Sequence, residues 1–167
     1  GEADDLHRRF KTRIRSPWFQ VPVVPPGQML LSKRSHRFPR LVLNEAEVVT
    51  TDTIYQGSIR PDQDVAPSDF VAAFHNSLTL LSTEIEGRSF GGGVLELVPS
   101  EISRLVVAVP RGFGSELQRL DALARASGTD SEDLVDETDR LLGKYLTGAS
   151  PDLLDTLRDA RASLMSR

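Results

Sequence analysis

Hydrophobic positions recur at helical spacing in some stretches of the chain and in short runs in others, which predicts a mixture of helices and strands. In residues 4–15, Leu6, Phe10 and Ile14 fall on one stripe of an amphipathic helix. Ser16-Pro17 ends this helix, because a proline pushes the preceding residue out of the α region. Strands are predicted at residues 28–32, 40–43, 47–51 and 53–59. Short strands with short loops favour a mainly antiparallel sheet.

The longest helical pattern covers residues 69–86, with Ser68 as its predicted N-cap and Gly87 at its end. Its apolar residues should face the sheet, namely Phe70, Phe74, Leu78, Leu81 and Ile85. Residues 88–93 are predicted as a loop and residues 99–101 as a helical turn. Residues 94–98 and 105–109 are predicted as further strands.

Helical patterns fill the chain after about Gly112. One helix is predicted over residues 113–127, a second after the capping-box pair Thr129 and Glu132, and a third after Ser150-Pro151. We expect the last two to form an antiparallel hairpin with a small core of its own. The predicted organisation is a basic helix or linker at 1–15, an α+β domain at 16–112 and a helical appendage at 113–167. In the α+β domain, a small, mainly antiparallel sheet packs on the long helix.

Composition excludes several classes of protein. The 167 residues are 39% hydrophobic, which is enough for a buried core. The chain has no cysteine, and its three histidines lie far apart, so we expect neither a disulfide nor a metal site. It has no apolar run of about 18 residues and no signal-peptide pattern, so a cytoplasmic location is expected.

The formal net charge of −4 hides an uneven distribution of charge. Residues 1–60 carry ten Lys/Arg and six Asp/Glu, whereas residues 61–112 carry three and seven, and residues 113–167 carry seven and eleven. The stretch from Leu6 to Asn44 holds nine Lys/Arg and no acidic residue. A basic region in an otherwise acidic protein is typical of a surface that neutralises phosphates.

Motifs for self-sufficient catalysis are missing from the sequence. The glycine cluster Gly91–Gly93 follows a helix and precedes a strand, whereas phosphate-binding loops run from a strand to a helix. A tight backbone passage is therefore the favoured interpretation of this cluster. No Ser-His-Asp set is recognisable. We expect no catalytic residue and no cofactor site in this chain, and hence no enzyme activity of the chain alone.

The basic loop between the first two predicted strands is the main candidate for binding DNA. Its cationic and polar side chains can bind phosphates and base edges. The candidates are Lys33, Arg34, Ser35, His36, Arg37 and Arg40, with Asn44 as a lesser one. A solubilising hairpin tip is the alternative, but such tips usually mix both signs of charge.

Other residues have two possible roles. Trp18 could stack on a base or pack beside the sheet, and packing is favoured. Arg88 could reach a phosphate or bond the last carbonyls of the preceding helix. The basic helix carries Arg8, Arg9, Lys11, Arg13 and Arg15, which could contact phosphates or face another domain.

Several segments together resemble the target-recognition region of bacterial N6-adenine DNA methyltransferases from restriction–modification systems. The first are residues 15–19, 34–37 and 39–44 and the Phe74-His75-Asn76-Ser77-Leu78 helix. The others are the glycine-rich block from Glu84 to Gly93, the following Val94-Leu95-Glu96-Leu97 with the Pro99-Ser100-Glu101 turn, and the closing strand Val107–Pro110. The resemblance covers about residues 15–110. The helices of residues 113–167 are similar to the tail of some members.

The resemblance implies that the chain is the C-terminal, DNA-binding part of such an enzyme. The family's Asn-Pro-Pro-aromatic motif is absent, since Val24-Pro25-Pro26-Gly27 does not match it. Methyl transfer from S-adenosylmethionine would therefore lie in a catalytic domain that this chain lacks. The implied partners are double-stranded DNA and that domain, with the protein at the nucleoid. The alternative is a protein–protein module that docks a partner subunit of a restriction–modification complex.

Overall fold

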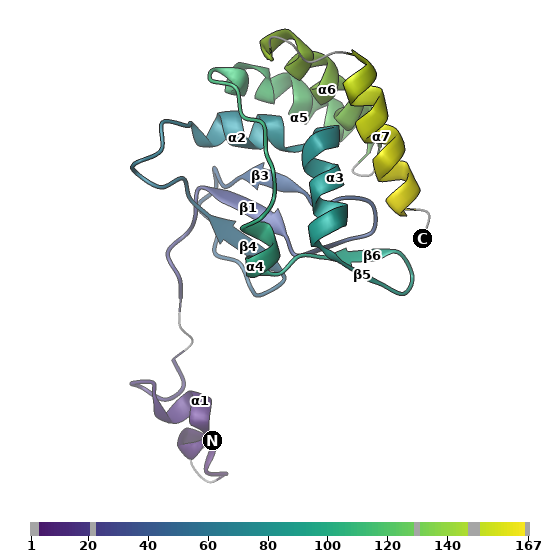
Figure 1. Ribbon diagram of the computed structural model, residues 1–167. Coiled ribbons are helices and arrows are strands. Elements are labelled where there is room, and N and C mark those ends of the chain that lie inside the picture. Colours follow the sequence, from purple (N-terminus) through teal and green to yellow (C-terminus); the bar gives the residue numbers. More distant parts are fainter. Residues whose placement is uncertain (1–3, 21–22, 129–130, 147–150, 166–167) are drawn as a thin grey trace.

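The computed structural model describes residues 4–20, 23–128, 131–146 and 151–165. The N-terminal segment lies apart from the body of the molecule (Figure 1). It holds a short 3-10 helix, η1 (Leu6–Arg8), and one turn of helix, α1 (Phe10–Arg13), separated by Arg9 in an extended conformation. The predicted helix over 4–15 is thus broken, and its apolar stripe is not buried, since Phe10 is 69% exposed and Ile14 73%.

The first sheet has the order β3-β1-β4 and is antiparallel throughout. Its strands β1 (Met29–Ser32), β3 (Leu41–Leu43) and β4 (Ile54–Gly57) lie within the predicted runs. The strand predicted at 47–51 is wrong. The side chain of Asn44 instead bonds the backbone of Val48 in both directions, and Glu47 has a positive φ of 49°, which turns the chain out of the sheet.

A second antiparallel sheet has the order β2-β6-β5. Strand β2 (Arg34–Ser35) lies in the predicted basic loop, and β5 (Arg88–Phe90) lies in the predicted loop before the glycines. The strand predicted at 94–98 is present as β6 (Val94–Glu96). Gly92 and Gly93 have φ of 86° and 75°, so they form the turn between β5 and β6. The strand predicted at 105–109 is wrong, because that stretch has no regular structure.

The predicted long helix is two helices, α2 (Pro67–Phe74) and α3 (Ser77–Glu86). Asn76 separates them because its side-chain oxygen accepts the backbone N–H of Thr79 at 2.9 Å and so caps α3. At the N-terminus of α2 the predicted cap Ser68 is wrong, since the helix begins at Pro67 after an extended Ala66. Gly87 ends α3 as predicted.

After the short helix α4 (Pro99–Ile102) and the 3-10 turn η2 (Phe113–Glu116), the chain forms three longer helices. These are α5 (Leu117–Ser127), α6 (Asp133–Tyr145) and α7 (Pro151–Met165). Thr129 and Ser150, which were predicted to cap two of them, lie outside the described residues. Figure 1 shows these helices stacked on α2 and α3, above the sheets.

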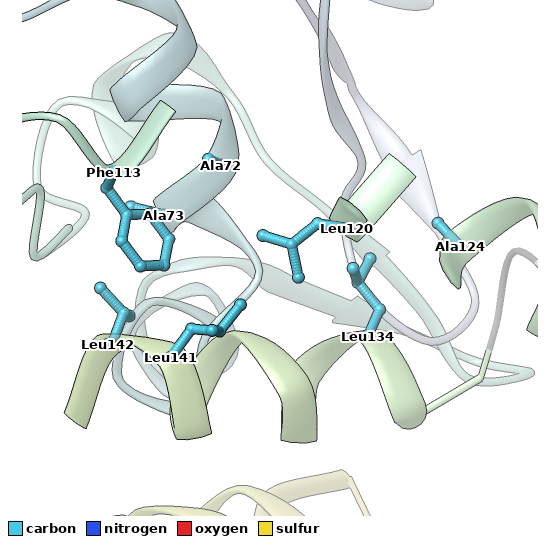
Figure 2. Close-up of a cluster of buried hydrophobic side chains, with 8 residues drawn as sticks. All are labelled: Ala72, Ala73, Phe113, Leu120, Ala124, Leu134, Leu141 and Leu142. Atoms are coloured by element: carbon cyan, nitrogen blue, oxygen red, sulfur yellow. The ribbon is translucent and has the colours of Figure 1, made fainter. Parts of the chain in front are cut away.

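Among the described residues, α5 and α6 share a core with α2, whereas a separate core was expected for the last two helices. Ala72 and Ala73 of α2 share one cluster with Phe113 and with residues of α5 and α6, as Figure 2 shows. The members from those two helices are Leu120, Ala124, Leu134, Leu141 and Leu142. A second cluster joins β1 and β3 to α2 through Met29, Leu31, Leu41, Val71 and Phe74. The predicted α+β class is confirmed, with α2 packed between the first sheet and the C-terminal helices.

Among the described residues, no helix has the length and apolar character needed to cross a membrane.

Candidate nucleic-acid interface

The second sheet turns one face toward α3 and the other outward. Leu95 lies on the inner face, because a Cβ added to Gly87 at the end of α3 would come within 2.7 Å of its side chain. Side chains alternate along a strand, so the neighbours of Leu95 on β6, Val94 and Glu96, point to the outer face. Their partners across the sheet share that face. The hairpin of β5 and β6 lies at the end of α3 in Figure 1.

Two arginines flank one carboxylate on this outer face. Arg34 of β2 and Arg88 of β5 are both the register partners of Glu96. The Arg34 Nε donates to Glu96 Oε2 at 2.8 Å, and the Lys33 ammonium lies 3.4 Å from Glu96 Oε1. Arg88 donates instead to Glu101 Oε1 at 2.6 Å. The side chains of Arg34 and Arg88 nevertheless stay 64% and 61% exposed.

Both carboxylates are held in the ionised form. The hydrogen bond from Arg34 lowers the pKa of Glu96, with further contributions from Lys33. For Glu101, the backbone N–H of Val98 is the main cause of a lowered pKa, and Arg88 adds to it. Each ionised carboxylate holds the Nε of its arginine, and each guanidinium keeps further N–H donors on a side chain that is more than half exposed.

A hollow of about 450 Å³ lies beside these charges. It is lined by Arg34, Ser35, His36, Phe90, Val94 and Glu96. Phe90 is 50% exposed and is the register partner of Val94. Sequence reasoning missed Phe90 and Glu96 because it placed β5 in a loop. The alternation Arg88-Ser89-Phe90 before the glycines and Val94-Leu95-Glu96 after them is a hairpin signal that could have found both residues.

The rest of the basic loop is anchored through Phe38. This ring is 2% exposed and packs with Leu80 and Val135. The guanidinium carbons of Arg40 and Arg161 lie 5.6 and 5.5 Å from its centroid, which is cation–π distance. The predicted contact residue Arg40 is therefore also part of this anchor.

Arg37 and the buried Arg161 share one acidic partner. Arg37 lies 3.7 Å from Glu132 Oε1 and is 52% exposed. Arg161 of α7 donates to the same carboxylate at 2.7 and 3.2 Å. Glu132 thus ties the basic loop to the N-terminus of α6 and to α7.

Three predicted site residues do not reach the outer face. Asn44 is 7% exposed, and its amide group bonds the backbone of Gly27 and Val48, so its role is structural. Ser35 pairs with Leu95 and so lies on the inner face, where its Oγ is buried without a hydrogen-bond partner in the described part of the chain. Trp18 contacts His7 and Phe19 in the N-terminal segment, so packing beside the sheet, the favoured prediction, is wrong.

A buried histidine supports the first sheet. His75 lies between α2 and α3, and its Nε2 accepts the backbone N–H of Leu41 on β3 at 3.4 Å. Burial is the main reason that its pKa falls from 6.5 to about 3, and the charge of Arg40 lowers it further. The ring is therefore neutral at physiological pH, which allows it to accept this hydrogen bond.

A buried aspartate fixes the helix behind the second sheet. Asp139 of α6 is 1% exposed and accepts the backbone N–H and the hydroxyl of Ser77 at 2.9 and 2.6 Å. Burial raises its pKa, while Ser77 and Arg158 of α7 oppose that rise. Asp139 thereby caps α3 from a neighbouring helix, a role that sequence reasoning missed because Asp139 and Ser77 are distant in the chain.

Comparison with known proteins identifies the family. A family model described as "Type II methyltransferase M.Eco57I, C-terminal domain" matches residues 1–142. The chain belongs to this family. The predicted membership in the C-terminal region of restriction–modification methyltransferases is therefore confirmed.

One characterised relative supports the same conclusion. The type II methyltransferase M.AccI of Acinetobacter calcoaceticus is 26% identical over 107 residues, which are 62% of this chain and 20% of that protein. The chain thus spans about a fifth of the length of this relative. No solved structure shows significant similarity to the chain.

Proposed function

We propose that this M.Eco57I-type C-terminal domain binds double-stranded DNA and selects the sequence on which a type II methyltransferase acts. The observation that carries the proposal is the placement of Arg34 and Arg88 on either side of Glu96, each more than half exposed. Guanidinium groups bind phosphates as bidentate donors and read guanine edges in the major groove. His36 and Arg37 extend the same surface along the basic loop.

The chemistry that we propose for the whole protein is methylation of the N6 amine of adenine, with S-adenosylmethionine as donor and the target base flipped out of the duplex. The glycine cluster does not have the geometry of a loop that binds such a cofactor. Gly91–Gly93 form a turn between two strands, so their amides do not stand at the N-terminus of a helix. We therefore assign recognition to this domain and catalysis to other parts of the protein, which would act at the nucleoid in the cytoplasm.

The test removes the two flanking arginines. In the double variant Arg34→Ala/Arg88→Ala, affinity for a labelled duplex at low salt should fall about tenfold or more. The slope of log affinity against log salt should fall by about 2, one for each lost phosphate contact. Fluorescence polarisation over a salt series measures both quantities.

A matched control is Arg60→Ala/Arg111→Ala. These two arginines are each 79% exposed and pair with surface acids away from the second sheet. The control removes the same amount of positive charge, but away from the second sheet. It should therefore keep the wild-type affinity and slope. Duplex binding that is independent of salt, or an unchanged affinity in Arg34→Ala/Arg88→Ala, would contradict the proposal.

The exposed apolar side chains of the N-terminal segment favour a second candidate function, docking of another protein or domain. Phe10, Ile14 and Phe19 are each at least 67% exposed. Grouped exposed apolar residues are typical of protein-contact surfaces. Removal of residues 4–20 should then abolish co-purification with a partner subunit while leaving duplex binding in place.

A further inference from the structure

The outer face of the second sheet combines aromatic and cationic side chains. In register across β2, β6 and β5, one row is Arg34, Glu96 and Arg88. A second row contains Val94 and Phe90, with His36 directly after β2 lining the same hollow. Aromatic and basic side chains interleaved on a sheet surface are the arrangement that stacks unpaired bases.

The dimensions of the hollow suit a flat heteroaromatic ring. Neighbouring strands lie about 4.8 Å apart, so His36 and Phe90 stand roughly 10 Å apart across β6. A base stacks at about 3.4 Å from its neighbour, so a base stacked on Phe90 lies above Val94 and leaves a wider gap on the side of His36. The hollow of about 450 Å³ has the size of a small-molecule site.

Polar groups at the edge of the hollow match the rest of a nucleotide. Arg34 and Arg88 lie at the two ends of the row next to the aromatic row, where they can reach the phosphates of a stacked nucleotide. Glu96 also lines the hollow and holds Arg34 beside it. A paired base inside a duplex hides both ring faces, so Phe90 can stack only on a base that has left the helix.

We propose that this face holds one unpaired nucleobase of a DNA strand, stacked on Phe90 and flanked by His36, a role that rests on the proposed function of DNA binding. Such a base arises wherever the duplex is opened, as it would be next to a flipped target. The site would hold the opened strand, whereas the arginines alone would bind intact duplex.

The experiment compares two labelled duplexes of the same sequence, one fully paired and one with a single bulged base. Wild-type protein should bind the bulged duplex several times more tightly, because stacking adds to the phosphate contacts. Phe90→Ala should lose this several-fold preference and bind both duplexes with the affinity that wild-type protein has for the paired one. Phe90→Trp, which retains an aromatic ring, should restore the preference.

Leu153→Ala is the matched control, because Leu153 is also an apolar side chain that is 50% exposed and it lies on α7. It should bind both duplexes as wild type does. Equal wild-type affinity for the two duplexes, or an unchanged preference in Phe90→Ala, would overturn the base site and leave the proposed duplex binding standing. Failure of wild-type protein to bind either duplex at low salt would overturn both.

Discussion

Two basic regions of this domain differ in how their charges are held. The outer face of the second sheet carries Arg34 and Arg88 on paired strands, each fixed by a buried carboxylate. The N-terminal segment is also rich in cations, but its two short helical pieces have no buried residue. Figure 1 shows it apart from the body.

This difference bears on function because a binding surface must present its donors in one arrangement. Ordering a long side chain costs conformational entropy, and the arginines of the sheet are already ordered in the free protein. The N-terminal cations would have to be ordered on binding. Density of positive charge, which is high in both regions, is therefore a weaker guide to the interface than the carboxylates and strands that hold the charge.

The largest expected effect contrasts two phenylalanines. Phe38→Ala should lower the free energy of unfolding by about 3–5 kcal/mol, because a buried ring is removed from the cluster that anchors the basic loop. Phe10→Ala in the N-terminal segment should change it by no more than about 0.5 kcal/mol. Urea unfolding followed by circular dichroism measures both, and equal losses would erase the contrast between the two regions.

The next largest effect is a loss of stability at low pH that depends on His75. The folded-state pKa of His75 is about 3, below the unfolded value of 6.5, so its contribution to stability is complete above pH 6.5 and is lost as the pH falls toward 3. The loss should reach about 2–3 kcal/mol near pH 4.5, at about 1.4 kcal/mol per pH unit. In His75→Gln this part of the pH dependence should vanish, since a neutral amide oxygen can accept the Leu41 N–H. A variant with the same acid sensitivity as wild type would assign the loss to other groups.

The smallest effect concerns the N-terminal cations. Arg8→Gln/Arg9→Gln/Lys11→Gln should reduce duplex affinity at moderate salt by no more than about threefold, because exposed charges on an unanchored segment are well screened. Fluorescence polarisation beside Arg34→Ala/Arg88→Ala gives the comparison. A loss as large as that of the sheet variant would make the N-terminal segment an equal part of the interface.

The local sequence pattern predicted those helices and strands whose own residues favour the conformation. Strands β1 and β3 follow from apolar runs between turn residues, and α5 to α7 follow from helical spacing. The break between α2 and α3 was missed because no proline or glycine marks it. Its signal is Asn76, a residue that favours N-cap positions, with Thr79 three residues later.

The second sheet shows the limit of local reasoning. Strand β2 has two residues, and its partner Glu96 lies 62 positions from Arg34, so pairing and not propensity makes it a strand. Charge alone made Arg34 a candidate, and Arg88 was one because it stands at the end of a helix. The features that join them, Glu96 between them and Phe90 beside them, required the register of three strands.

The alternation of inner and outer side chains on the second sheet also bears on how specificity can change. The inner face, with Leu95 against α3, maintains the fold, whereas His36 and Phe90 on the outer face are exposed. Substitutions at His36, Phe90 and Val94 can therefore accumulate at little cost in stability. A lineage of such domains, or a combinatorial library built on this one, could explore new target sequences on an unchanged scaffold.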